Sequence, residues 1–220
     1  MQNIIIVCTT HSEKGACTSL ELLKIFERID PDVIFEEIPP SKHDFIYNIS
    51  KNKTLETEAV KLYIQKKDIP HIPVDIDYML DNEKFWSDVE YMFAVLEKNS
   101  IEYAHNKERL DTLTCENGFN YLNSDNCVKM LERLAVIEKN VLERLNDDDL
   151  FYVNNFWYEL HRKREIAMIN SIYQYCIDHC FNNAVLYVGV QHGHSIIKRV
   201  QQIKNNYDIQ IKWKFNDLLQ

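Results

Sequence analysis

The N-terminal part of the chain alternates between short apolar runs and amphipathic stretches. Residues 3–9 form a continuous apolar run rich in β-branched side chains, which is typical of a strand buried on both faces. Residues 18–29 carry a helical apolar face, and Thr18 and Glu21 have the spacing of a capping box. A second predicted strand begins with the apolar residues 33–35 and runs on to Ile38. This order predicts a βαβ unit, whose two strands are parallel.

The same patterns predict the other elements at the two ends of the chain. We expect helices over 54–67 and 195–205, and strands over 71–76, 184–190 and 208–214. Because neither end of the chain could bury a core alone, the strands of both ends should share one sheet. We therefore expect a single α/β domain over 1–220, with a central mixed, largely parallel sheet of about five strands and helices on both faces.

The middle of the chain, about 80–181, has helical periodicity and many charges. Helices are expected over 82–99, 101–112, 124–146 and 154–181. The clear breaks lie at Asn117-Gly118 and at 146–149, although the second break could instead be a helix N-cap within a hairpin. We interpret this part as a helical insertion between strands, and its amphipathic helices could support a homodimer.

Composition and charge narrow the function classes. Of the 220 residues, 45% are hydrophobic and 27% are charged, which is typical of globular proteins. The net charge of −9 and the lack of a Lys/Arg block argue against a nucleic-acid partner, which would need a basic surface. No apolar run approaches the roughly 20 residues of a membrane helix, and no signal peptide is recognisable. We therefore expect a cytoplasmic protein with no membrane partner, whose six cysteines are reduced.

Polar side chains follow three of the predicted strands. His11 follows the first strand, Glu36 and Glu37 end the second, and His192 follows the strand over 184–190. Ligands bind at the carboxyl ends of parallel strands, so these side chains could meet in one crevice, or each could be an ordinary loop residue. Two imidazoles and a carboxylate suit a divalent ion such as Mn, Co, Fe or Zn, which could activate water. Adjacent Glu36 and Glu37 should point to opposite faces, so one at most faces the crevice unless the chain bends.

Four short motifs occur in order near the two ends of the chain. They are Thr9-Thr10-His11, Pro31-Asp32-Val33-Ile34-Phe35-Glu36-Glu37-Ile38, Arg164-Glu165-Ile166-Ala167-Met168 and Gly189-Val190-Gln191-His192. Together they resemble motifs of the TraB/PrgY/Tiki-like superfamily, which includes erythromycin esterases and ChaN-like relatives. The resemblance implies that His11, Glu37 and His192 hold a metal ion, or that Glu37 is the base for the attacking water. It also implies that Arg164 stabilises an oxyanion or binds a substrate carboxylate.

The resemblance implies a metal-dependent hydrolase of the protease or esterase type, acting on a peptide or a small molecule. Two departures from the motifs favour the alternative, a non-catalytic module that binds a ligand, a peptide or haem. Cys8 stands in the position of a glycine, and Glu165 stands in the position of an asparagine. Lys42 lies where relatives often carry arginine, and Asp75 or Asp77 could match a further acidic residue of the family.

Other candidates have a simpler interpretation. His192 lies between Gly189 and Gly193, which argues against a place in the core. Four other histidines are expected to be surface residues or satisfied core residues, namely His43, His71, His105 and His161. His194 could face the site together with His192 if both lie in a loop, but His192 is the favoured candidate.

Overall fold

The computed structural model describes residues 1–50, 53–79, 81–203, 207 and 209–215. Its centre is a five-stranded sheet of order β3-β2-β4-β1-β5, in which every described pair of neighbours is parallel. The strands are β1 (Gln2–Thr9), β2 (Val33–Glu36), β3 (His71–Pro73), β4 (Asn183–Gly189) and β5 (Ile211–Lys214). The predicted α/β fold is confirmed, and its sheet is parallel rather than mixed.

The late strand β4 lies between β1 and β2, and this placement joins the two ends of the chain in one core. Thr9 is opposite Gly189, and Glu36 is opposite Tyr187. Every residue of β4 after Asn183 is buried, as its continuous apolar run predicts. The three central strands therefore end at the same edge of the sheet. The predicted strand start at Asp208 and the last two positions of the helix predicted over 195–205 lie outside the described residues.

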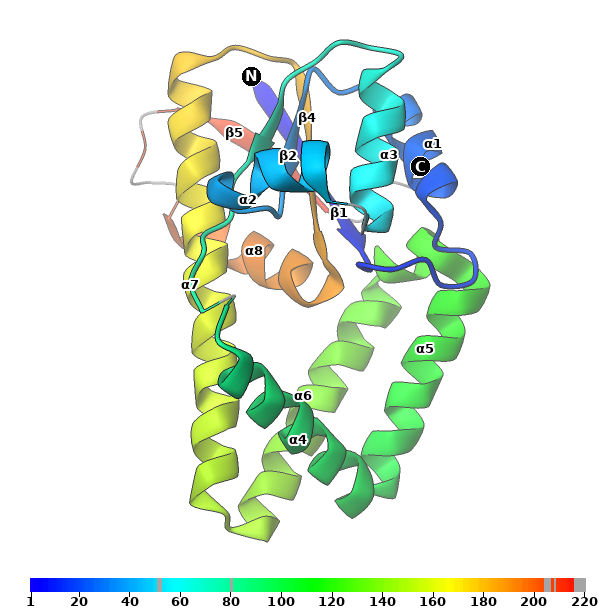
Figure 1. Cartoon of the computed structure of the whole chain (residues 1–220), viewed down its shortest axis with the longest axis vertical. Coiled ribbons are helices and arrows are strands. Elements are labelled where there is room, and N and C mark those ends of the chain that lie inside the picture. Colours follow the sequence, from blue (N-terminus) through cyan, green and yellow to red (C-terminus); the bar gives the residue numbers. More distant parts are fainter. Residues whose placement is uncertain (51–52, 80, 204–206, 208, 216–220) are drawn as a thin grey trace.

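Helices cover both faces of the sheet (Figure 1). They include α1 (Ser19–Ile29), α3 (Leu55–Ile64), α7 (Asp148–Asp178) and α8 (Val190–Ile203). Helices α1 and α3 share a hydrophobic cluster with Val185, whereas α7 and α8 share a second cluster with Leu186. Consecutive residues of β4 thus serve opposite faces, because side chains alternate along a strand. Thr18 is the N-cap of α1 and accepts a hydrogen bond from the amide of Glu21, as its spacing predicts.

The middle of the chain forms helices that extend beyond one end of the sheet, and α7 runs from them along the sheet (Figure 1). Besides α7, these helices are α4 (Glu83–Asn99), α5 (Ile101–Leu122) and α6 (Asp125–Leu145). Asp147 caps α7 by accepting hydrogen bonds from two amides, so the break at 146–149 is a helix cap. Helix α5 does not end at 112 but kinks at Gly118, which has a positive φ of 57°. None of the described helices has both the length and the apolar character needed to cross a membrane.

One short element was not predicted from the periodicity. Helix α2 (Pro40–Asp44) continues into a π-helical turn, η1 (Phe45–Ile49), between β2 and α3. The pair Pro39-Pro40 ends the strand, as predicted, but Pro40 also begins this helix, where its missing N–H costs nothing. Tyr47 of η1 reaches back to the end of β2 and donates a hydrogen bond to Glu36.

Candidate functional site

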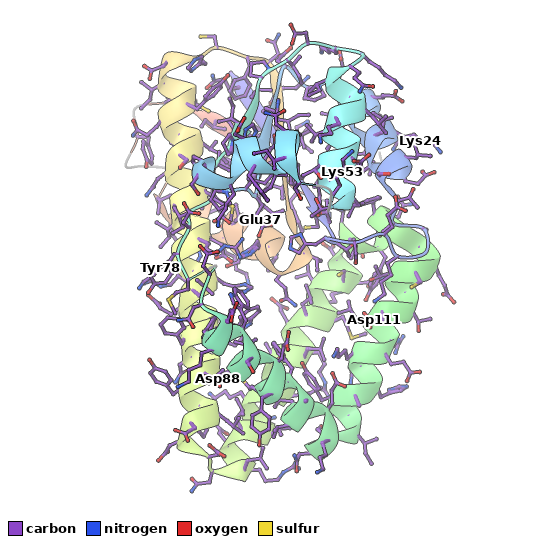
Figure 2. All side chains as sticks on the ribbon, viewed as in Figure 1. Lys24, Glu37, Lys53, Tyr78, Asp88 and Asp111 are labelled. Atoms are coloured by element: carbon purple, nitrogen blue, oxygen red, sulfur yellow. The ribbon has the colours of Figure 1, made fainter. Side chains whose placement is uncertain are left out.

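Glu37 is the centre of the polar cluster at the strand ends. It directly follows β2, and its side chain is only 3% exposed. Its Oε2 accepts a 2.6 Å hydrogen bond from the amide of Gly189, at the end of β4. Its Oε1 accepts a 2.6 Å bond from Nη2 of Arg164 and lies 3.3 Å from Nε2 of His192. Figure 2 places Glu37 between the sheet and the helical middle part of the chain.

Arg164 projects from α7 and joins two buried carboxylates. Besides its bond to Glu37, it donates to Oδ2 of Asp75 from Nε at 3.0 Å and from Nη2 at 2.6 Å. Of the two adjacent glutamates, Arg164 therefore contacts Glu37. Of the two candidate aspartates, Arg164 contacts Asp75 and not Asp77. Burial disfavours the charged form of Glu37, but the positive charges of His192 and Arg164 outweigh it and hold the pKa of Glu37 well below its usual value.

His192 lies in the first turn of α8 between two carboxylates. Its Nδ1 is 3.1 Å from Oε1 of Glu165, and its Nε2 faces Glu37. Although burial opposes the charge, Glu37 and Glu165 raise the pKa of His192 to about 9. The residue is 3% exposed, so the expectation that it lies outside the core is wrong. The reason is that α8 begins directly after Gly189, which puts His192 on the buried face of a helix instead of in a loop.

Glu165 holds His192 from the side opposite Glu37. Its Oε1 faces the imidazole, while its Oε2 accepts hydrogen bonds from Oγ of Ser195 and from Nε of Arg199. Burial raises the pKa of Glu165, but the bonds from His192, Arg199 and Ser195 lower it overall. The residue that departs from the expected asparagine therefore fixes a neighbouring site residue. The sequence offered no signal for this role beyond the departure itself.

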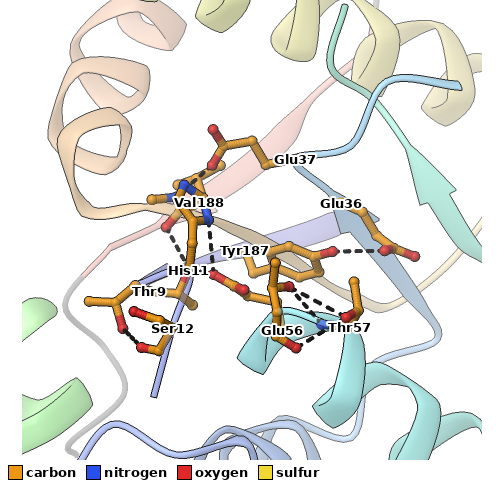
Figure 3. Close-up of polar contacts among 12 residues, drawn as sticks. Thr9, His11, Ser12, Glu36, Glu37, Glu56, Thr57, Tyr187 and Val188 are labelled. Atoms are coloured by element: carbon orange, nitrogen blue, oxygen red, sulfur yellow. Dashed lines mark hydrogen bonds and ion pairs between the residues drawn. The ribbon is translucent and has the colours of Figure 1, made fainter. Parts of the chain in front are cut away.

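His11 lies at the exposed end of the cluster, with 68% of its side chain accessible. Its Nδ1 is 3.5 Å from Oε1 of Glu56, a buried residue of α3 that also accepts a bond from Thr9 (Figure 3). The bond to Glu56 raises the pKa of His11, and the charge of Glu37 adds to it. The His11 Nε2 and the Glu37 Oε2 lie 3.4 Å and 3.5 Å from the point that a Cβ on Gly189 would occupy.

His11 and His192 therefore share one arrangement. In each residue Nδ1 faces a buried carboxylate, Glu56 or Glu165, and Nε2 lies on the side of Glu37. Histidines that bind metal ions usually have such a carboxylate on the second ring nitrogen. The 3.3 Å between His192 Nε2 and Glu37 Oε1 also suits two ligands of one ion, because bonds of about 2.0–2.2 Å at tetrahedral angles separate the ligands by about 3.3 Å.

His11 does not yet converge fully on the other two. Among the described residues, the sets of three candidate ligand atoms that all lie within 4.8 Å of one another are Glu36–His43–His71 and His161–Glu165–His192. The set of His11, Glu37 and His192 is not one of them, so the exposed His11 would have to move toward the other two to complete it. Glu37 is in direct contact with both Arg164 and His192.

His161 joins the cluster from α7, although a plain structural role was expected for it. Its ring stacks on that of His192, with centroids 4.5 Å apart and an interplanar angle of 27°, and it also contacts Trp157. Burial and the charge of His192 lower the pKa of His161 to about 3, so it is neutral. Because nearly parallel stacked rings direct their nitrogen lone pairs side by side, His161 is better placed to support His192 than to share an ion with it.

The other residues singled out in the sequence lie apart from this cluster. His194 is 3.5 Å from Glu132, and Lys42 pairs with exposed Asp81. Cys8 is buried, and its backbone N–H and C=O both bond to the side chain of Asn123. Glu36 points to the opposite face of the sheet, as the alternation along a strand predicts, and accepts a hydrogen bond from Tyr187 (Figure 3).

A cavity of about 670 Å³ lies beside α8 within the helical middle part. Its lining includes the aromatic residues Phe93, Tyr103 and Trp157, together with Gln191 and Ser195 of α8. Because Ser195 also donates to Glu165, the cavity adjoins the network that holds His192.

Comparison with known proteins finds no match to a family model, to a curated protein or to a solved structure.

Proposed function

We propose that the strand ends form the site of a metal-dependent hydrolase, in which His11, Glu37 and His192 hold a divalent ion. One observation carries this proposal: both histidines have Nδ1 on a buried carboxylate and Nε2 on the side of Glu37. The resemblance of the four sequence motifs to the TraB/Tiki-like superfamily implies the same reaction class. A peptide or a small ester is the substrate class that follows from that resemblance.

The donor set suits a borderline ion such as Zn, Mn, Co or Fe. A bound ion of this kind supplies Lewis-acid polarisation and lowers the pKa of water. The chain contributes the positioning: Glu56 and Glu165 fix the two imidazole rings, and Asp75 fixes the guanidinium of Arg164. Arg164 then lies beside Glu37 as a fixed positive charge for an anionic oxygen of the substrate.

His192 determines how the site responds to pH. With a pKa of about 9, its Nε2 carries a proton that faces Glu37 at neutral pH. An ion bound to that nitrogen would replace the proton, so binding should release a proton and strengthen as pH rises.

The test is a calorimetric titration of the protein with Zn²⁺ or Mn²⁺ at pH 6, 7 and 8 in buffers of different ionisation enthalpy. We expect affinity to rise with pH, and we expect Glu37→Gln and His192→Gln each to weaken binding at least about 10-fold. His194→Ala is the matched control, because it removes an imidazole from the same turn that contacts Glu132 instead. Hydrolysis of a panel of peptides and esters should follow the same order of variants. An absence of binding to the wild-type protein would refute the proposal.

The alternative of a non-catalytic ligand-binding module is favoured by the cavity beside α8. Its volume and aromatic lining suit a small organic molecule. A ligand bound there should raise the melting temperature of the wild-type protein and of Glu37→Gln equally, without turnover. Addition of hemin tests the haem version of this idea, since binding would produce a shifted Soret band.

A further inference from the structure

A second cluster of possible ligands surrounds Glu36, on the sheet face opposite Glu37. Glu36 is fully buried at the end of β2, while His43 of α2 and His71 of β3 are about one-fifth exposed. Nδ1 of His71 is 2.5 Å from Oε1 of Glu36 and 3.2 Å from Nε2 of His43. Nε2 of His43 is 3.6 Å from the same carboxylate oxygen. Three elements thus bring three donor atoms to one point.

The other oxygen of Glu36 is already satisfied. Its Oε2 accepts hydrogen bonds from the hydroxyls of Tyr47 at 2.6 Å and of Tyr187 at 2.7 Å, which use both of its lone pairs. Burial raises the pKa of Glu36, but the contacts with the two histidines and the hydrogen bonds from the two tyrosines outweigh it and lower the pKa to about 2, so the carboxylate is ionised. Oε1 is therefore the oxygen left for the histidines and for any cation.

Hydrogen bonds alone satisfy the three possible ligand atoms poorly, namely the two histidine nitrogens and the carboxylate oxygen. If Nδ1 of His71 carries a proton, it donates that proton to Glu36, and the lone pair of His43 Nε2 can only share it. If His43 Nε2 carries a proton instead, it lies 3.6 Å from Glu36 and can donate only to Nδ1 of His71 at 3.2 Å. That arrangement leaves no proton between Nδ1 of His71 and the Glu36 oxygen 2.5 Å away. A cation at the centre of the triangle would accept a lone pair from each of the three atoms.

The spacing of the triangle fits a transition-metal ion. Its edges of 2.5, 3.2 and 3.6 Å bracket the roughly 3.3 Å that separates two ligands of a tetrahedral zinc ion. The ring centroids of His43 and His71 are 4.9 Å apart and the two nitrogens are 3.2 Å apart, so the nitrogens lie on the sides of the rings that face each other. This geometry differs from the stacked pair of His161 and His192, in which the rings lie face to face.

We propose that Glu36, His43 and His71 form a second divalent-metal site, selective for a zinc-like ion with one nitrogen from each histidine and one carboxylate oxygen. Tyr47 and Tyr187 donate hydrogen bonds to the other oxygen of this carboxylate and so fix its orientation, as residues next to a metal site commonly do for its ligands. The ion would bind α2 and the three-residue edge strand β3 to the end of β2. Its main effect would be to stabilise this corner of the sheet, next to Glu37 but on the other face.

The experiment is a titration with Co²⁺, whose tetrahedral complexes absorb strongly in the visible range, combined with an anomalous-scattering map of crystals soaked in Zn²⁺. We expect the map to place an ion in contact with Glu36, His43 and His71. His71→Ala should remove that ion and its share of the visible absorption, and it should abolish the ion-dependent rise in melting temperature that this site contributes. Tyr47→Phe keeps all three ligands and should still bind.

The two proposed sites can be distinguished in the same experiment. Glu37→Gln should leave the Glu36 ion in place, whereas His71→Ala should leave any ion at Glu37 in place. If the wild-type protein binds one ion, and if Glu37→Gln keeps that ion while His71→Ala loses it, the result would support the site at Glu36. The same result would refute the site at Glu37. Soaked wild-type crystals with no ion at Glu36, or an unchanged ion count in folded His71→Ala, would overturn the proposal.

Discussion

Two adjacent glutamates of one strand end are stabilised in opposite ways. Glu37, on the α7 and α8 face, is held by the charges of Arg164 and His192 and by one backbone amide. Glu36, on the α2 and α3 face, is held by two tyrosine hydroxyls and two histidines. Both carboxylates are buried and ionised. The same residue type can thus be kept charged inside a protein either by fixed charges or by neutral donors such as tyrosine hydroxyls.

The difference has a consequence for cation binding. An ion at Glu37 has to compete with a permanent guanidinium that Asp75 holds in place. An ion at Glu36 meets no permanent positive charge among the ligands that contact the carboxylate. Binding of an ion at Glu36 should therefore require less displacement of existing positive charge than binding at Glu37.

The largest expected effect comes from removal of the permanent charge. Arg164→Ala leaves Glu37 and Asp75 buried without their cation, which typically costs about 3–5 kcal/mol in the free energy of unfolding. Urea denaturation monitored by circular dichroism measures this change. Arg162→Ala is the matched control on the same helix, because its pair with Glu159 is exposed and should contribute little to the free energy of unfolding. Equal effects of the two variants would contradict the assignment of Arg164 as the central cation.

The central strands and the directions of Glu36 and Glu37 could be predicted from the sequence alone. Continuous apolar runs predicted the central strands because a parallel strand with helices on both sides needs apolar residues on both faces. The meeting of Glu37 and Arg164 was expected, and so was the opposite direction of Glu36. The metal-binding and catalytic roles assigned to these residues stay predictions.

The partners of Glu36 could not be predicted in the same way. His43 lies on a five-residue helix and His71 begins a three-residue strand, and both elements are too short to show a period. Glu56 and Glu165 are similar cases, since each lies in a helix as an ordinary polar residue until packing places it against His11 or His192. Periodicity identifies the elements, whereas tertiary packing decides which of their polar side chains meet.

A second prediction uses pH to test the charges on the Glu37 side. The pKa of His192 is raised from 6.5 to about 9, so its contribution to stability is fully present below pH 6.5 and is lost as pH rises through 9. In the presence of a chelator, wild type should therefore be more stable than His192→Gln at pH 6. The gap, of the order of 3 kcal/mol at most, should close by pH 9.5. Urea denaturation of both proteins at the two pH values measures it.

Leu186→Ala provides the control for that prediction. It opens a cavity in the buried strand β4 and should cost about 2–5 kcal/mol. Because no titrating group is removed, the cost should be the same at pH 6 and pH 9.5. A gap for His192→Gln that is equally independent of pH would show that His192 contributes by packing and not by its charge.

The smallest effect is expected on the Glu36 side, where neutral donors share the stabilisation. Tyr187→Phe removes one of two hydroxyls from Oε2 of Glu36 and changes the volume little, while Tyr47 and His71 remain bonded. A hydrogen bond to a charged group contributes about 1.5–3 kcal/mol, so the loss should be smaller than that from Arg164→Ala. Glu36→Gln combined with Tyr187→Phe separates the bond from the packing: if the hydroxyl acts through the carboxylate charge, the second change should cost less once the charge is gone. Equal costs in both backgrounds would mean that Tyr187 stabilises β4 as an aromatic ring, and the neutral-donor description of this face would then be wrong.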